Sequence, residues 1–335
     1  MMSYSQKRDS SLDSLKFFLI VFVVFGHVLE EFGVNNTLGC MRAMIYCFHM
    51  PTFVFLSGYF SKNVKPEKLF SSCLLPYFIF NTVYVFVFAK SFNILTPKYL
   101  YWYPLSLFFW RLLIITVKNK KRLLPISFVI GLYAGYLPEA DRFLSISRTI
   151  AFFPFFVAGC MFTEQEMNKL REIPKWISLS GIIIGELIVI GLDHYKIMPV
   201  KMYELIECYK KTLGQRFDLH EEQGVLLRLC IYFIGFAMLF LIISLTRRNT
   251  RLSLTAAWGK RTLTILMLSG FFVKILFFVF VKTGFDYKSL SIKYQVLLTI
   301  VISFFTLYIC GNKWIYDLYN KIFNYINYAK RNDAA

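Results

Sequence analysis

Long apolar runs separated by short basic clusters are the feature that most constrains how this chain folds. A helix that crosses a bilayer needs about 20 mostly apolar residues, or somewhat fewer when aromatic and basic residues flank it. This pattern predicts an all-α integral membrane protein, a bundle of about ten transmembrane helices. The predicted spans are about 14–29, 43–60, 70–89, 100–117, 122–137, 148–163, 176–193, 224–245, 262–281 and 293–311.

The composition supports this class and excludes a soluble one. Of the 335 residues, 57% are hydrophobic and 17% are charged, whereas soluble proteins contain about 45–50% apolar and about 25% charged residues. Such a chain lacks the polar residues that would cover a soluble surface. No soluble domain or low-complexity linker interrupts the apolar runs. We therefore expect a single domain over residues 1–335, with a helical bundle at about 14–311 and a basic tail at 312–335.

The charge distribution predicts a topology and argues against nucleic-acid binding. The net charge is +18, but the basic residues lie in short clusters between the spans rather than in one stripe. With the N-terminus inside, the inner segments hold 21 Lys and Arg residues and the outer segments hold 11. The positive-inside rule then predicts that both termini are cytoplasmic. The seven cysteines show no C-x-x-C spacing and no histidine at zinc-ligand spacing, so neither a disulfide framework nor a metal site is expected.

Two histidines fall inside predicted spans, where ionisable groups are costly and often functional. His27 lies about 13 residues into the first span, roughly 20 Å from its inner edge at about 1.5 Å per residue. About 10 Å of a hydrocarbon core of about 30 Å then remains above it. His49 lies about six residues into the second span, which descends from outside, so it lies roughly 9 Å deep. The two rings are predicted to share one depth, where adjacent helices would bring them together.

Other polar and aromatic side chains share this outer half of the membrane. Arg148 opens the sixth span, and Trp102 lies near the outer start of the fourth. A cavity with a neutral histidine, cations and aromatic rings suits activation of a hydroxyl and stabilisation of an oxyanion. The alternative is that these residues only anchor the helices at the membrane interface. Pro51 and Pro154 each remove a helical hydrogen bond near these groups, which predicts kinks beside the cavity.

Two further segments have more than one interpretation. On the inner side, Asp13 and Lys16 share a helix face, with Arg8 ahead of them, and they either pair with each other or meet an anionic ligand. The long outer connection, roughly 194–223, predicts one amphipathic helix that either caps a site on the outer face or lies on lipid headgroups. Its apolar residues at helical spacing are Met202, Leu205, Ile206, Tyr209 and Leu213.

Two motifs resemble signatures of membrane-bound acyltransferase family 3. In the first, Leu12-Asp13-Ser14-Leu15-Lys16 precedes Val24-Phe25-Gly26-His27, with ten residues between the basic residue and the histidine. In the second, Phe48-His49-Met50-Pro51 precedes Phe55-Leu56-Ser57-Gly58-Tyr59-Phe60, as in the fucose 4-O-acetylase-like branch of that family. The resemblance runs over about residues 8–275. Weaker matches are Leu74-Leu75-Pro76-Tyr77, the Trp102 region, the segment from Arg148 to Gly159, and Trp258-Gly259-Lys260-Arg261-Thr262-Leu263.

The resemblance implies a ten-helix enzyme of the cytoplasmic membrane that O-acylates carbohydrates, usually with acetyl from acetyl-CoA. Its partners would be an acyl-CoA donor, a carbohydrate acceptor and membrane lipids. By match, His27 would be the essential histidine, acting as general base or as acyl relay, with Lys16 and His49 as further catalytic residues. The residues implied to bind the substrates are Asp13, Arg148, Trp102, Arg8 and Ser57.

The chain departs from the family pattern at two places. Lys16 stands where many members carry Arg, which keeps the charge but loses bidentate geometry. The stretch Leu266-Met267-Leu268-Ser269-Gly270 lacks the histidine that many members have in the ninth helix. A transporter that exports an acylated or small anionic compound is the alternative function, because it would also have many spans and buried cations. No inverted repeat in the sequence favours that alternative.

Overall fold

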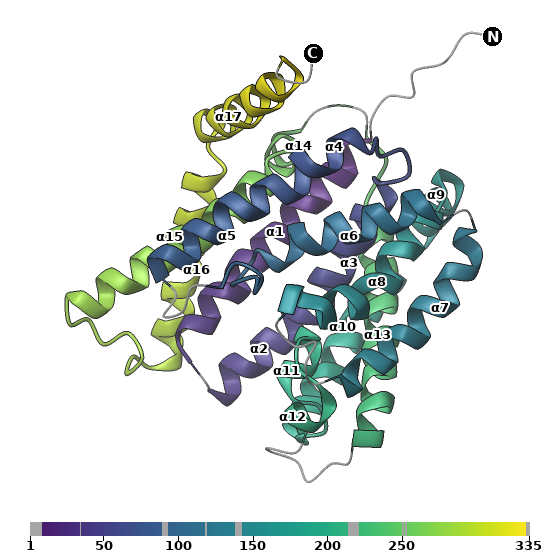
Figure 1. Ribbon diagram of the computed structural model, residues 1–335. Coiled ribbons are helices and arrows are strands. Elements are labelled where there is room, and N and C mark those ends of the chain that lie inside the picture. The colour runs from purple at the N-terminus through teal and green to yellow at the C-terminus, as the bar shows by residue number, and fades with distance from the viewer. Residues whose placement is uncertain are drawn as a thin grey trace.

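All regular secondary structure in the described part of the chain is helical, as a computed structural model shows (Figure 1). This part comprises residues 9–33, 35–88, 93–117, 119–137, 143–213, 221–249, 251 and 253–332. The helices pack side by side around one extended apolar core. The expected all-α architecture is confirmed.

Eight helical segments among the described residues are long and apolar enough to cross a membrane. They confirm a multi-pass integral membrane protein. The first is α1 (Ser10–Glu31), and the second combines α2 (Asn36–Tyr46) with α3 (His49–Tyr59). The others are η1 (Phe70–Leu74) with α5 (Leu75–Phe88), η4 (Phe143–Ser145) with α8 (Ile146–Met161), α10 (Lys175–His194), α13 (Glu221–Ser244), α15 (Thr262–Lys282) and α16 (Ile292–Cys310).

Two of the ten predicted spans correspond to shorter helices. The span expected at 100–117 is α6 (Trp102–Thr116), with 15 residues, and the one expected at 122–137 is α7 (Lys120–Tyr133), with 14. At about 1.5 Å per residue each is shorter than a typical hydrocarbon core. The number of ten crossings and the cytoplasmic location of the termini stay predictions.

The helices α3 and α8 cross at backbone contact because both carry glycine at the crossing. A Cβ added to Gly58 would lie 2.0 Å from the carbonyl oxygen of Phe156, and one added to Gly159 would lie 2.0 Å from that of Phe55. Small residues let transmembrane helices approach closely, and van der Waals packing then holds them together. This tight crossing fixes the position of α3, which carries His49, against α8, which carries Arg148.

The second membrane segment is interrupted just before Pro51, as the sequence predicts. Between Tyr46 and His49 the backbone leaves helical geometry, with φ −123° and ψ −35° at Phe48. Pro51 has no N–H to donate to the carbonyl of Cys47, so α2 and α3 do not form one continuous series of helical hydrogen bonds. By contrast, α8 runs without interruption through Pro154.

The connection at 194–223, expected on the outer side, does not form the single amphipathic helix that was predicted. It contains two short helices, α11 (Val200–Glu204) and α12 (Tyr209–Leu213). Leu205 separates them because it adopts a left-handed conformation, with φ 53°. Four of the five predicted apolar residues, Met202, Leu205, Tyr209 and Leu213, are buried in the protein, so they do not lie on lipid. Residues 214–220 lie outside the described part.

One end of the bundle is defined by contacts around the start of α1. The carboxylate of Asp9 forms a 2.7 Å ion pair with Arg171 in α9 (Glu164–Glu172). The backbone N–H of Ser10 donates to the carbonyl of Asn249, which follows α13. Next to this end, α14 (Leu254–Gly259) packs on α1 so closely that a Cβ on Gly259 would lie 1.7 Å from the carbonyl oxygen of Asp13.

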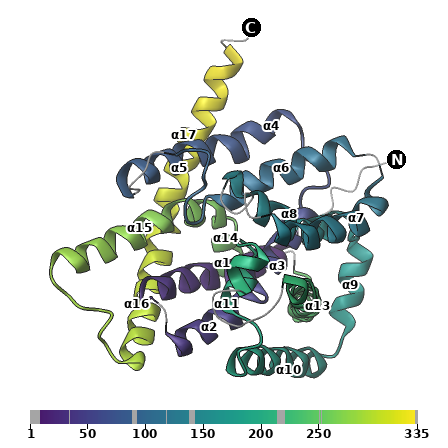
Figure 2. The same ribbon diagram turned by 60° about the horizontal axis from the view of Figure 1, so that its bottom comes forward.

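Part of the chain predicted as a basic tail at 312–335 is a helix, α17 (Lys313–Asn332). It projects away from the bundle, as Figure 2 shows. Its buried rings Tyr319 and Phe323 stack on Phe80 of α5, with centroid distances of 6.2 and 6.4 Å. The remaining helical turns, α4 (Glu67–Leu69) and η2 (Ala134–Tyr136), connect neighbouring segments.

Candidate active site

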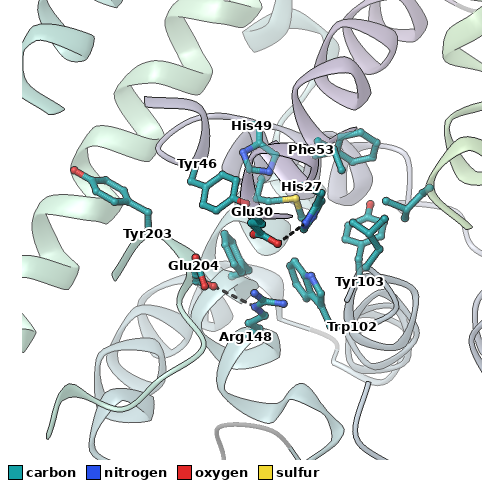
Figure 3. Close-up of a pocket in the computed structure, with 15 residues that line it drawn as sticks. His27, Glu30, Tyr46, His49, Phe53, Trp102, Tyr103, Arg148, Tyr203 and Glu204 are labelled. Atoms are coloured by element: carbon teal, nitrogen blue, oxygen red, sulfur yellow. Dashed lines mark hydrogen bonds and ion pairs between the residues drawn. The ribbon is translucent and has the colours of Figure 1, made fainter. Parts of the chain in front are cut away.

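A small cavity lies where α1, the α2–α3 break, α6, α8 and α11 meet (Figure 3). It holds about 40 Å³ of free space, room for a few water molecules. Both intramembrane histidines, one arginine and several aromatic rings line it. The lining residues are Val23, His27, Glu30, Tyr46, His49, Met50, Phe53, Leu100, Trp102, Tyr103, Arg148, Phe152, Tyr203, Glu204 and Leu266.

His27 is paired with a carboxylate on its own helix. Its Nδ1 lies 3.1 Å from Oε2 of Glu30, because residues three apart share one face of α1. We assign the ring proton to Nδ1, since a carboxylate can only accept a hydrogen bond. In the neutral ring the lone pair then resides on Nε2. Oε1 of Glu30 accepts a hydrogen bond from the hydroxyl of Tyr46 and lies 3.7 Å from Nη2 of Arg42.

His49 is held by the break in the second segment. Its Nδ1 lies 2.8 Å from the carbonyl oxygen of Ile45, and its ring lies 5.0 Å from that of Tyr46, centroid to centroid. The carbonyl can only accept, so Nδ1 of His49 carries the proton and Nε2 is an acceptor. In each neutral ring Nε2 is therefore the nitrogen that accepts a hydrogen bond. Of the two histidines, only His27 contacts a carboxylate.

The opposite wall carries the cation Arg148 and a second carboxylate. The guanidinium of Arg148 lies 4.8 Å from the ring centroid of Trp102, and its Nε donates to the backbone oxygen of Glu204 at 3.2 Å. The carboxylate of Glu204 is 2.5 Å from Nη2 of Arg42. Burial raises the pKa of Glu204 above its ordinary value, and the negative charge of Glu30 adds to this shift. Glu204 therefore takes up a proton more readily than an exposed glutamate.

The structure brings four of the residues singled out in the sequence into this cavity: His27, His49, Arg148 and Trp102. Ser57 lies beside it. Its hydroxyl lies within hydrogen-bonding distance of that of Tyr103 and donates to the carbonyl of Phe53 at 2.9 Å, and both of these residues line the cavity.

The other predicted residues lie elsewhere. Lys16 and Asp13 form a 2.7 Å ion pair on α1 and are not among the residues that line the cavity. Lys16 is eleven residues from His27 in sequence, which is about 16 Å along a helix. Arg8 lies outside the described residues.

The sequence interpretation missed four polar residues of the cavity, Glu30, Tyr46, Tyr203 and Glu204. Glu30 was overlooked because the first span was expected to end at residue 29, whereas α1 continues to Glu31. A signal was present, since Glu30 stands three residues after His27. Tyr99 was also missed. Its ring lies 4.7 Å from that of His27, and its hydroxyl donates to the His27 carbonyl at 3.1 Å.

A family model described as an acyltransferase domain matches residues 9–312. The chain belongs to this acyltransferase family. Family membership favours the enzyme over the exporter, because the chain carries an acyltransferase domain together with helices long enough to cross a membrane.

Among known proteins, the chain is similar to Nodulation protein NolL of Mesorhizobium japonicum. The two are 37% identical over 71 residues, which is 20% of this chain and 19% of that protein. No solved structure matches the chain.

Proposed function

We propose that this acyltransferase transfers an acetyl group from acetyl-CoA to a hydroxyl of a cell-surface polysaccharide or lipid-linked glycan, within the cytoplasmic membrane. The observation that carries the proposal is the 3.1 Å contact between His27 Nδ1 and Glu30 in a cavity that His27 lines. A carboxylate at Nδ1 fixes the tautomer and stabilises the imidazolium that forms when Nε2 takes a proton.

In the proposed reaction His27 acts as the general base. Its Nε2 accepts the proton of the acceptor hydroxyl while the hydroxyl oxygen attacks the carbonyl carbon of the thioester. Negative charge develops on the carbonyl oxygen, and Arg148 is the cation of the cavity best suited to stabilise it. When the carbon–sulfur bond breaks, the leaving thiolate takes the proton from His27. The imidazole returns to its initial state and the acetyl ester remains on the acceptor.

His49 is proposed to orient the acceptor rather than to act as the base. Its Nε2 is an acceptor of hydrogen bonds, so it suits a second hydroxyl on a sugar. A backbone carbonyl stabilises an imidazolium less than a carboxylate does, because it carries no net charge. The rings of Trp102, Tyr103 and Phe53 supply apolar faces against which a sugar ring packs.

We propose that the donor is bound toward the Asp9 end of the bundle, where Lys16 lies. A lysine there would attract the phosphates of acetyl-CoA. The proposal agrees with the family resemblance, which implies that Lys16 and Asp13 are functional residues.

The test uses purified protein in nanodiscs with radiolabelled acetyl-CoA and a panel of cell-envelope glycans. Wild type is compared with His27→Ala, and thermal unfolding shows that both are folded. Label that reaches a glycan only with wild type supports the proposal. Equal transfer by His27→Ala would refute the assignment of the base, and the absence of transfer to any glycan would refute the proposed acceptor.

A further inference from the structure

A second cavity lies at the end of the bundle away from Asp9, between the start of α2 and the connection from α10 to α11. In Figure 1 this end is at the bottom, where α2, α11 and α12 gather. We call it the outer cavity. It holds about 630 Å³ of free space, far more than the cavity around His27. Pockets that bind sugar-sized ligands and larger are typically about 300–1,000 Å³.

One side chain joins the two cavities. Arg42 lines the outer cavity, while its Nη2 contacts Glu204 at 2.5 Å and Glu30 at 3.7 Å, and both of these carboxylates line the cavity around His27. The Nε of Arg42 is buried and has no hydrogen-bond partner among the described residues. A buried guanidinium N–H without a partner is costly, and a bound acceptor group would satisfy it.

The sizes of the two cavities indicate that they bind different parts of the acceptor. A space of about 40 Å³ is far too small for an oligosaccharide. The remainder of a glycan would therefore lie outside this space, and the outer cavity adjoins it through Arg42.

The lining charges of the outer cavity favour an anion. Arg42, Lys196 and Lys201 contribute positive charge and Asp193 is the acid that lines the cavity, with His194 beside it. Lys196 is exposed and lies in a turn with φ 53°. Lys201 is 55% exposed, and its pairing with a carboxylate at 3.3 Å leaves it accessible to a ligand.

We propose that the outer cavity binds the acceptor glycan and that this glycan carries carboxylate or phosphate groups. The assignment rests on the proposed function, because it supplies the acceptor of the same reaction. Lys196 and Lys201 hold the anionic groups, and Arg42 receives the residue next to the reacting sugar.

The experiment measures binding without acetyl-CoA, so that it is independent of transfer. Three fluorescein-labelled probes are titrated into protein in nanodiscs of neutral lipid: a tetramer of galacturonic acid, a neutral galactose tetramer, and the galactose tetramer carrying phosphate monoesters. Fluorescence anisotropy reports the Kd of each at low salt and at 0.15 M salt. The variants are Lys196→Gln, Lys201→Gln and the double variant. Lys210→Gln is the matched control, because Lys210 is an exposed lysine that does not line the cavity.

We expect at least one anionic tetramer to bind more tightly than the neutral one. Comparison of the galacturonic acid tetramer with the phosphorylated galactose tetramer distinguishes a carboxylate site from a phosphate site. Each lysine variant should weaken that binding up to about fivefold, as removal of an exposed ion pair does. Salt at 0.15 M should also weaken the binding of the anionic tetramer, whereas Lys210→Gln should leave its Kd unchanged. Equal binding of neutral and anionic tetramers, or variants that bind like wild type, would overturn the assignment.

The same protein is then tested for acetyl transfer to all three unlabelled tetramers. Transfer to the neutral tetramer with no preference for the anionic ones overturns this inference and leaves the proposed function standing. Tight, lysine-dependent binding without acetylation of any tetramer supports the anion site and counts against the proposed function.

Discussion

Two ion pairs on the same helix have the same spacing but different surroundings. On α1, Asp13 pairs with Lys16 at 2.7 Å, and His27 pairs with Glu30 at 3.1 Å. Both are three residues apart, and the basic side chains are similarly buried, at 16% exposed for Lys16 and 14% for His27. Neither the sequence spacing nor the burial of the basic side chain therefore separates a reactive pair from a supporting one.

The difference lies in what packs against each pair. Asp13 is fully buried, and α14 approaches its backbone so closely that only glycine fits at position 259. The ammonium of Lys16 lies 5.0 Å from the ring centroid of Phe60. The imidazole of His27 instead faces a cavity, with its Nδ1 held by Glu30. We infer that the His27 pair performs the chemistry and that the Lys16 pair supports helix packing and donor binding.

The largest expected effect is that of His27→Gln on turnover. Glutamine fills a similar volume and keeps a polar head but cannot take a proton, so kcat should fall by about 10²–10⁴-fold. Steady-state acetyl transfer at saturating acetyl-CoA measures it, with melting temperature as the control for folding. A kcat within tenfold of wild type would contradict the inference that the His27 pair, and not the Lys16 pair, performs the chemistry.

A large effect on stability is expected from Gly259→Ala. The added Cβ would lie 1.7 Å from the carbonyl oxygen of Asp13, so α14 must move away from α1. We expect the free energy of unfolding to fall by about 3 kcal/mol, the upper part of the range for overpacking. Thermal unfolding in detergent checks this. Gly191→Ala is the control, because nothing lies within 4 Å of that position. Equal melting temperatures for the two variants would contradict the tight packing of α14 on α1.

A smaller effect on the reaction, seen in donor binding, is expected from Lys16→Gln. Loss of one cation near the phosphates of acetyl-CoA should raise its KM by about five- to tenfold, which corresponds to the roughly 1 kcal/mol that a typical hydrogen bond contributes. The kcat should stay within about twofold of wild type. A fall in kcat as large as that of His27→Gln would instead give Lys16 a direct part in the reaction.

The smallest effect is expected at the start of the same helix. Asp9 caps α1 by accepting from the backbone N–H of Ser11 at 3.0 Å, and it pairs with Arg171. Burial alone would raise the pKa of Asp9, but hydrogen bonds from Ser11 and Arg171 outweigh it and lower the pKa overall. A lowered carboxyl pKa contributes stability that is complete above the unfolded value of about 3.9 and is lost as the pH falls through the folded value.

Asp9→Asn should therefore lower stability by about 1 kcal/mol at pH 7, because asparagine still caps the helix but cannot form the ion pair with Arg171. The difference in melting temperature from wild type should shrink as the pH is lowered through 4 toward 3. A difference that is the same at pH 7 and pH 3 would show that charge on Asp9 plays no part.

Much of the architecture follows from local sequence properties. Apolar length predicts most of the membrane-crossing helices, and Pro51 predicts the break in the second one. Counting residues from opposite sides of the membrane predicts that His27 and His49 lie at one depth, and both line the same cavity. The helices, the break and the shared cavity are confirmed because helix rise is nearly constant, and the membrane depth of the two rings stays a prediction.

What could not be predicted depends on contacts between distant segments. The break at Leu205 turns one expected surface helix into two short ones and brings Glu204 into the cavity. Arg42 looks like an ordinary loop charge in the sequence, but its partner Glu204 is 162 residues away. Such pairs follow from the tertiary fold and leave no periodic signal in the sequence.

The most direct test of the His27–Glu30 pair as the general base is a double-mutant cycle on kcat. Four proteins are compared at saturating substrates: wild type, Glu30→Gln, His27→Gln and the variant with both changes. If Glu30 acts through His27, Glu30→Gln alone lowers kcat by about 100-fold and adds nothing once His27 is replaced, as residues acting as one unit do. The same fractional loss in both backgrounds would contradict the pair, because Glu30 would then act independently of His27.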